Sequence, residues 1–321
     1  MPSIRETELE MVQLVLPEHA NTRGSLYGGQ MMHWITTAAT MAAMRVAKGA
    51  VVLAGMDELD FLHAVLIGDV VTLNARVEFI GRSSMEIDVD VHAEDPRTGA
   101  RRRTTSSHLA MVAVDDQGRP RPVGTQISPA DPDEEARYND ARARKQRRSE
   151  FLAARLHEGT SGEDDRPGLP HTLEMSRIVF PEDAVLGTLM FAGKLMIDLD
   201  QAASIVAVRY CRCPVVTASI DALSFFAPIR VGEIVVYHAS LNHVGRSSME
   251  IGIKVLAEEP LTGARRHTCT VYITMVHVTA DGAQPVPAYR PETDVALRRF
   301  REAEARRRIR QARRAALKAA P

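Results

Sequence analysis

The chain contains two copies of one sequence, and this repeat limits its possible folds more than any other feature. Residues 81–87 read GRSSMEI, and the same letters return at residues 245–251. Residues 98–102 read TGARR and return at residues 262–266, again 164 positions further along the chain. Matches this dense in one register without gaps indicate an internal duplication, so the chain must build one structural unit twice.

The composition is that of a globular protein without a dominant charge. Of the 321 residues 45% are hydrophobic, and a net charge of −1 gives no reason to expect a nucleic-acid partner. The longest apolar run is broken by Arg45 and Lys48, so we expect no membrane span. The first residues lack an apolar signal core, and three cysteines are an odd count for a disulfide framework. We therefore expect a cytoplasmic protein with reduced thiols.

A glycine loop followed by a long apolar run begins each copy. In the first copy the loop carries Asn21, Gly28 and Gly29, and the run from Met31 to Val46 contains only one charge, Arg45. A helix formed by this run would carry apolar residues on almost every side, which predicts a buried central helix. Glycines let the backbone approach a ligand, and the free amides at a helix start suit an oxyanion or phosphate. An ordinary tight turn before a core helix is the alternative.

Alternating apolar residues predict a sheet around this helix. Residues 69–79 alternate, and so do residues 85–91, where Glu86 and Asp88 fall on the polar face of a half-solvated antiparallel strand. Further strands are predicted at residues 11–17, 51–61 and 109–114, with equivalents in the second copy. Such a sheet buries its apolar face only by wrapping around the single long helix, so the fold class is α+β.

The sequence divides into four segments. We predict repeat domains at residues 1–125 and 171–290, a helical segment with a flexible linker at residues 126–170, and a basic helix at residues 291–321. The basic helix is consistent with a nucleic-acid or membrane surface, or with a solvated or partner-packed helix.

Several motifs together resemble a known family. They are HANTRGSLYGG at residues 19–29, Asp57 with Phe61, Gly68 with Asp69, and the repeated GRSSME turn. On these residues the chain resembles hotdog-fold acyl-CoA thioesterases, and most closely the cytosolic acyl-CoA hydrolases with two hotdog domains in one chain. The resemblance covers about residues 10–150 and 172–310.

The resemblance implies two tandem hotdog domains, each an antiparallel sheet wrapped around a long central helix, with active sites where the domains meet. It implies hydrolysis of acyl-CoA to free fatty acid and CoA without a metal or another cofactor. It also implies a homo-oligomer, commonly a trimer of double-hotdog chains. We expect removal of the residues after Pro291 to leave the hydrolytic site intact.

The family pattern predicts one composite site per chain. It places an Asn in the loop and a carboxylate seven residues after the second glycine. The first copy has Asn21 but Thr36 in place of the carboxylate, whereas the second has Asp200 but Val185 in place of the Asn and Ala192 in place of the first glycine. A site in this fold combines the loop of one domain with the helix of the other. The complementary losses therefore leave Asn21 with Asp200 as one complete site.

Roles follow from the resemblance. Asp200 would act as general base or as nucleophile, Asn21 would hold the water or the carbonyl, and the Gly28 and Gly29 amides would stabilise the oxyanion. Asp198 is the competing carboxylate, and Asn21 is otherwise a turn residue that supports its own loop. The candidates for the CoA phosphates, which are otherwise solvated turn residues, are Arg82, Ser83, Ser84, Arg246, Ser247 and Ser248.

Two other functions remain open. A protein that binds acyl-CoA without hydrolysing it would result if both sites had lost activity. A hotdog dehydratase acting on hydroxyacyl thioesters would need a histidine as base, and neither predicted helix carries one at a suitable position.

Overall fold

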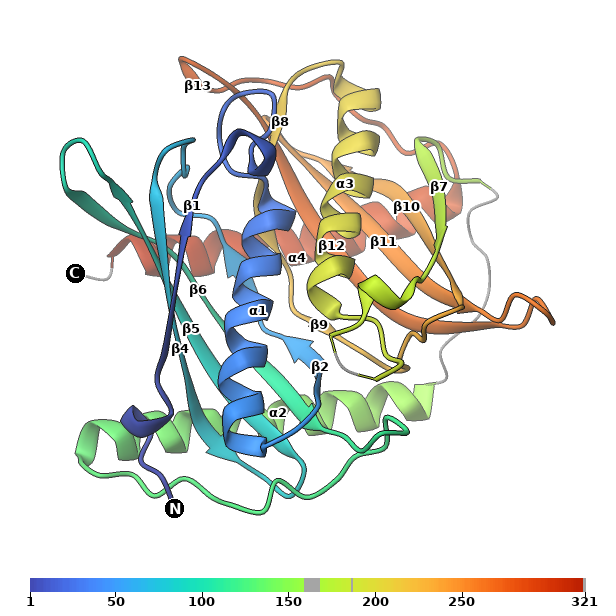
Figure 1. Ribbon diagram of the computed structural model, residues 1–321. Coiled ribbons are helices and arrows are strands. Elements are labelled where there is room, and N and C mark those ends of the chain that lie inside the picture. Colours follow the sequence, from blue (N-terminus) through green and yellow to red (C-terminus); the bar gives the residue numbers. More distant parts are fainter. Residues whose placement is uncertain (159–167, 186, 320–321) are drawn as a thin grey trace.

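Two long helices lie side by side at the centre of the molecule (Figure 1). They are α1 (Gly28–Ala47) from the first repeat and α3 (Ala192–Cys211) from the second. Both end in a residue with left-handed backbone, Lys48 and Arg212. The structure is a computed structural model, and it describes residues 1–158, 168–185 and 187–319.

Each helix is wrapped by an antiparallel sheet, as the sequence predicts. The first sheet has the strand order β1 (Leu9–Leu14), β4 (Val70–Ile80), β5 (Ser84–Asp95), β6 (Ala100–Ala113), β2 (Val51–Met56) and β9 (Leu223–Ser224). The second has the order β3 (Leu59–Asp60), β8 (Val215–Ile220), β12 (Arg265–Thr279), β11 (Ser248–Glu258), β10 (Ile234–Val244) and β7 (Thr172–Ile178), with β13 (Gly282–Ala283) paired to β12. Short 3₁₀ helices lie at Arg5–Thr7, Pro17–His19 and Pro181–Asp183. The two-hotdog fold is confirmed.

The repeats exchange one short strand each. The β3 strand of the first repeat pairs with β8, where Leu59 lies opposite Ile220, and β9 of the second repeat pairs with β2, where Met56 lies opposite Leu223. The prediction of one continuous strand over residues 51–61 is therefore wrong, because the chain leaves one sheet after Met56 and enters the other at Leu59.

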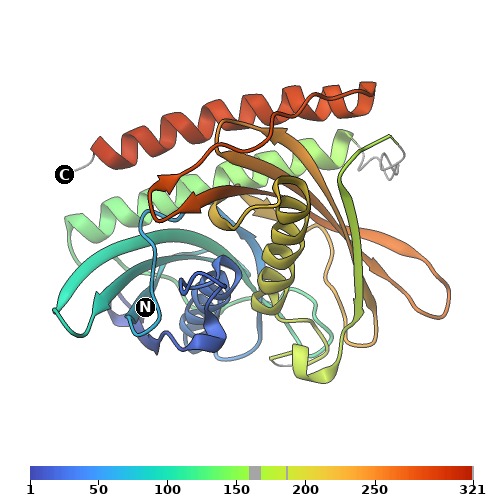
Figure 2. The same ribbon diagram turned by 90° about the horizontal axis from the view of Figure 1, so that it is seen from above.

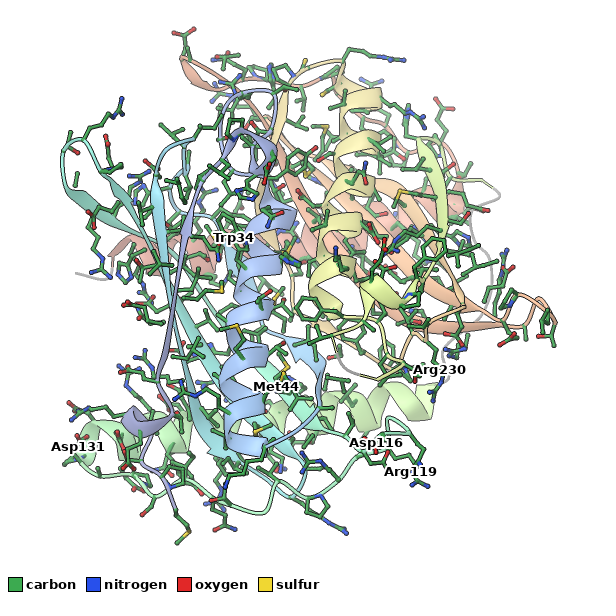
Figure 3. All side chains as sticks on the ribbon, in the orientation of Figure 1. Trp34, Met44, Asp116, Arg119, Asp131 and Arg230 are labelled. Atoms are coloured by element: carbon green, nitrogen blue, oxygen red, sulfur yellow. The ribbon has the colours of Figure 1, made fainter. Side chains whose placement is uncertain are left out.

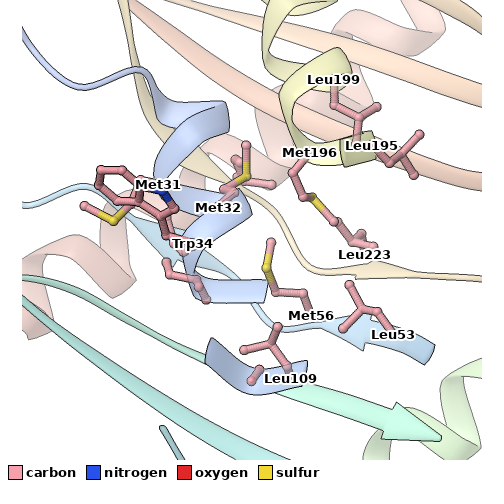
Figure 4. Close-up of a cluster of buried hydrophobic side chains, with 14 of the residues drawn as sticks. Met31, Met32, Trp34, Leu53, Met56, Leu109, Leu195, Met196, Leu199 and Leu223 are labelled. Atoms are coloured by element: carbon pink, nitrogen blue, oxygen red, sulfur yellow. The ribbon is translucent and has the colours of Figure 1, made fainter. Parts of the chain in front are cut away.

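A shared apolar core joins the halves. Figure 4 shows Met32 and Met56 of the first repeat in one cluster with Met196 and Leu223 of the second, and all four are at most 2% exposed. Burial of large apolar side chains between the repeats stabilises the pair far more than surface contacts would. The two central helices are therefore fixed relative to each other.

Two further helices cover the outer faces of the sheets. Figure 2 shows α2 (Pro132–Glu158) and α4 (Asp294–Ala319) lying on the side of the sheets away from α1 and α3. The prediction of a half-solvated strand at residues 85–91 is wrong, because α2 covers it. Glu86 is 1% exposed and accepts a hydrogen bond from Arg148 at 2.7 Å.

The second repeat uses the same arrangement with α4. The Arg310 guanidinium contacts Glu250 at 2.6 Å and Asp221 at 2.7 Å, as Arg148 contacts Glu86 and Asp57 in the first repeat. The basic C-terminal segment is thus a helix packed on the sheet. The predicted linker falls largely on residues 159–167, which lie outside the described residues. No described helix is both long and apolar enough to cross a membrane.

Candidate active site

A cavity of about 610 Å³ opens between the repeats. Its wall combines the first repeat's glycine loop, strand β8 of the second repeat and the C-terminal half of α4. Five of the residues predicted from the sequence line it, namely Asn21, Gly28, Arg246, Ser247 and Ser248. Residues far apart in the sequence therefore meet at one cavity.

Asp200 lies directly behind this wall, and it is completely buried. Its Oδ2 accepts the Gly29 amide at 2.8 Å, and its Oδ1 accepts the Thr217 hydroxyl at 2.5 Å. Thr217 itself lines the cavity. Burial raises the pKa of Asp200 to about 6, while the hydrogen bonds from Thr217 and Gly29 lower it in part. Such a carboxyl is mostly ionised at neutral pH and can accept a proton.

The two glycines permit a very close approach of α1 to α3 and β8. A Cβ added at Gly28 would lie 2.6 Å from the Thr217 Cβ, and one at Gly29 would lie 2.8 Å from the Asp200 Cβ. Any side chain here would push the helices apart. The predicted role of the Gly29 amide needs correction, because this amide donates to Asp200. The Gly28 amide has no hydrogen-bond acceptor among the described residues and so remains available for an oxyanion.

Asn21 both lines the cavity and supports its own loop. Its Nδ2 donates to the Ser25 hydroxyl at 2.9 Å, and its Oδ1 accepts the Arg23 amide at 2.9 Å. These contacts hold the loop in the wall of the cavity.

Asp198, the competing carboxylate, has a different environment. Its Oδ2 accepts hydrogen bonds from Arg177 at 2.8 Å and from the Tyr237 hydroxyl at 2.6 Å. Asp198 does not line the cavity that Asn21 lines. Two residues along a helix turn the side chain by about 200°, which explains why the two carboxylates face different surroundings.

A smaller cavity of about 320 Å³ occupies the corresponding place on the other side. Thr36, Val185 and Ala192 line it. The Thr36 hydroxyl donates to the Met32 carbonyl of its own helix at 2.8 Å. Leu53 stands where Thr217 stands in the larger cavity. At the smaller cavity, therefore, Leu53 and Thr36 replace the Thr217–Asp200 pair, and the Thr36 hydroxyl bonds within its own helix.

The two repeated turns differ in the same way. Arg246, Ser247 and Ser248 line the larger cavity. In contrast, Arg82, Ser83 and Ser84 do not line it, nor do they line the smaller one. At the smaller cavity the charged side chains are acidic, Asp115 and Asp116, the latter labelled in Figure 3.

Sequence reasoning missed several residues of the larger cavity. Thr217 could have been found, because a threonine in a buried strand replaces Leu53 of the other copy. The α4 residues Arg307, Arg310 and Arg314 also line the cavity. Removal of the residues after Pro291, which we predicted to leave the hydrolytic site intact, would take away part of this wall. Helical periodicity does not reveal which sheet or cavity a helix covers. Within the described ranges no His, Cys, Asp or Glu side chains cluster as a metal site would require.

Comparison with known proteins agrees with this architecture. The family described as the thioesterase superfamily matches residues 23–100 and 187–264, once in each repeat. Mouse acyl-coenzyme A thioesterase 11 is 30% identical over 316 residues, which cover 95% of this chain and 53% of the relative. Human cytosolic acyl coenzyme A thioester hydrolase is 26% identical over 311 residues, which cover 92% of this chain and 81% of that relative.

A solved structure matches about half of this chain. A crystal structure described as an apo-hexameric acyl-CoA thioesterase is 38% identical, with a TM-score of 0.45, and the match covers 48% of this chain and 97% of that one. The chain spans about half the length of the mouse relative. The sequence matches in both repeats show that the chain belongs to the thioesterase superfamily and carries two copies of its hotdog domain.

Proposed function

We propose that the protein hydrolyses acyl-CoA to free fatty acid and CoA at one composite site per chain. The observation that carries this proposal is the position of Asp200. A buried carboxyl of the second repeat is bonded to the first turn of α1 and, through Thr217, to the wall of the larger cavity. Among the described residues that line the smaller cavity, no carboxyl is placed in this way. The named activities of the relatives support the same chemistry.

In the proposed reaction Asp200 is a general base. Both of its oxygens accept hydrogen bonds and none of its surface is exposed, which suits proton transfer better than direct attack on a carbonyl. Water adds to the thioester carbonyl carbon as its proton passes through the Thr217 hydroxyl, which lines the cavity, to Asp200. The carbon–sulfur bond then breaks, and the proton passes to the departing CoA thiolate.

Two groups from the first repeat would assist. The Gly28 amide, free at the start of α1, donates to the oxyanion, and one such donor is typically worth about 3 kcal/mol in the transition state. Asn21, held in the cavity wall by its loop, orients the water or the carbonyl. Because both come from the repeat that lacks Asp200, neither half alone assembles the site.

Thiol release tests this function. Wild-type protein and the variants Asp200→Asn and Thr36→Ala are incubated with acyl-CoAs of several chain lengths, and free CoA thiol is measured. We expect turnover by the wild type and by Thr36→Ala, and a loss of orders of magnitude in Asp200→Asn. Binding without thiol release would favour the acyl-CoA-binding protein. Loss of a hydroxyacyl substrate as an enoyl thioester, without thiol release, would favour the dehydratase.

We propose in addition that the enzyme works in the cytoplasm as a trimer of double-hotdog chains. The human relative's name supports the compartment. Edge strands support the assembly, because β1 exposes half of Val12 and Leu14, and the equivalent β7 exposes Ile178 at 49%. Paired apolar edges at matching positions of both repeats suit contacts with further copies of the chain.

A further inference from the structure

We propose that Arg307 and Arg314 of the C-terminal helix bind the phosphates of the CoA moiety, together with Arg246. This inference rests on the proposed acyl-CoA substrate and adds the residues that select its nucleotide end. It gives the basic helix α4 a direct part in substrate binding rather than a purely structural one.

The shape of the larger cavity brings these residues to the site. The same continuous cavity is lined by Gly28 and Thr217 at the proposed reaction centre and by Arg307, Gln311 and Arg314 of α4. Spacings of four and three residues place these α4 side chains on one face of the helix. An acyl-CoA with its thioester at Gly28 would therefore extend toward a basic surface.

The arginines of α4 from residue 306 to residue 314, apart from the exposed Arg308, divide into two groups by their partners. Arg306 and Arg310 pair with the buried Glu250, and Arg313 pairs with Asp60, so these three are held by carboxylates of the protein. Within the described residues neither Arg307 nor Arg314 has a carboxylate at ion-pair distance.

The turn arginine completes the group. Arg246 likewise has no ion-pair partner in the part of the chain that the structure describes, and it borders the same cavity. A Cβ added at Gly245, the residue before Arg246, would lie 3.4 Å from Arg307 Nε. The turn and the helix therefore meet here. Guanidinium groups without a protein carboxylate are suited to bidentate binding of phosphate.

The other half of the molecule provides an internal comparison. Since Arg148 of α2 matches Arg310 of α4, Lys145 matches Arg307. Lys145 lies over the ring of Phe79 and does not line the smaller cavity. Among the described residues no Lys, Arg or His lines that cavity. In the part of the chain that the structure describes, the basic wall thus occurs on the side that has Asp200 and not on the other, as expected of a substrate site and not of a generally basic surface.

The experiment compares substrates that differ only in their phosphates. Arg307→Ala, Arg314→Ala and the double variant are assayed with an acyl-CoA and with the same acyl thioester of pantetheine, which lacks the nucleotide. A charge-assisted hydrogen bond is worth enough to raise KM for acyl-CoA by about tenfold per arginine. We expect kcat to stay within about twofold and the pantetheine kinetics to stay unchanged. Arg308→Ala is the matched control, because its side chain is 77% exposed and pairs only with Glu304.

Direct binding separates this proposal from the enzymatic one. Calorimetric titration of CoA and of pantetheine into the same variants needs no turnover, and CoA should bind more weakly to the double variant while pantetheine does not change. Unchanged CoA binding and unchanged KM would overturn the role of Arg307 and Arg314, whatever the wild type hydrolyses. An equal loss for both ligands would also overturn it. Wild-type protein that binds CoA but releases no thiol would instead refute the hydrolase.

Discussion

Asp200 in the middle of α3 accepts a hydrogen bond at 2.8 Å from the amide of Gly29, in the first turn of α1. The start of α1 has no capping side chain of its own, so a carboxyl from the other repeat supplies the acceptor that this helix end requires. The helix dipole favours a negative charge at this position. The base of the proposed reaction is therefore also a structural cap between the two repeats.

The buried carboxyl should reduce stability at neutral pH. Its pKa is about 6 in the folded protein and about 3.9 in an unfolded chain. The folded state therefore retains the proton more strongly, and stability present below about pH 4 is lost as the pH rises through 6. The loss amounts to about 3 kcal/mol.

Asp200→Asn cannot ionise and keeps a similar shape. Its free energy of unfolding should exceed that of the wild type by an amount that grows by about 3 kcal/mol from pH 4 to pH 8, although its hydrolysis is nearly abolished. Denaturant titrations across this range measure the difference. A difference that does not change with pH would mean that Asp200 is not a buried titrating group.

Thr217 should control the pH dependence of hydrolysis. In the wild type kcat should rise with pH through about 6 as Asp200 ionises. Thr217→Val keeps the volume but removes the hydroxyl that stabilises the ionised carboxyl, so the rise should move up by about one pH unit and kcat should fall. Thr217→Ser retains a hydroxyl and serves as the control. A profile unaltered in the valine variant would rule out a positioning role.

The two cavities should respond unequally to matched substitutions. Asn21→Ala should reduce hydrolysis by orders of magnitude, and Asn21→Ala with Asp200→Ala should be little worse than either alone, since groups acting together are not additive. Val185→Ala and Thr36→Ala, at the smaller cavity, should stay within a few-fold of the wild type. Steady-state kinetics with one acyl-CoA provide the comparison. Loss of turnover in Thr36→Ala would show that we have assigned the catalytic base to the wrong helix.

The ion pair under α2 should matter for stability and not for turnover. Arg148 is 12% exposed and Glu86 is 1% exposed, so Arg148→Ala leaves a buried carboxylate without its partner. Loss of about 3 kcal/mol in the free energy of unfolding is expected. The neighbouring Arg147→Ala, at an exposed position, should change stability little. Chemical denaturation measures both, and equal effects would show that burial of the pair is unimportant.

Assembly should depend on the exposed edges. Leu14→Glu combined with Ile178→Glu introduces charge at equivalent places on β1 and β7 and should dissociate the trimer, which light scattering detects. Arg301→Glu, on an exposed part of α4, is the control. A wild-type monomer at micromolar concentration would refute the trimer while leaving the hydrolase untouched.

The fold could be predicted from the sequence because the apolar pattern of each strand and helix is periodic and because the whole pattern occurs twice. Apolar alternation identified most strands, and the 164-residue offset allowed Thr36 to be compared with Asp200 directly. Contacts between helices and strands were harder to predict from the sequence. Glu86 looks solvated in its strand pattern, since nothing in that pattern records that α2 lies over it. For the same reason the sequence indicated a basic helix but not that Arg307 would reach the cavity.

The exchanged strands have a consequence for how the chain is made. The first sheet receives its last strand from Leu223 and Ser224, which pair with Met56 and Gly55. When the first repeat leaves the ribosome, its β2 edge is open and α1 lacks the acceptor that comes from residue 200. The first half keeps this strand edge unpaired until the second copy has been translated past Ser224. Duplication in one polypeptide guarantees that the missing strand always arrives on the same molecule.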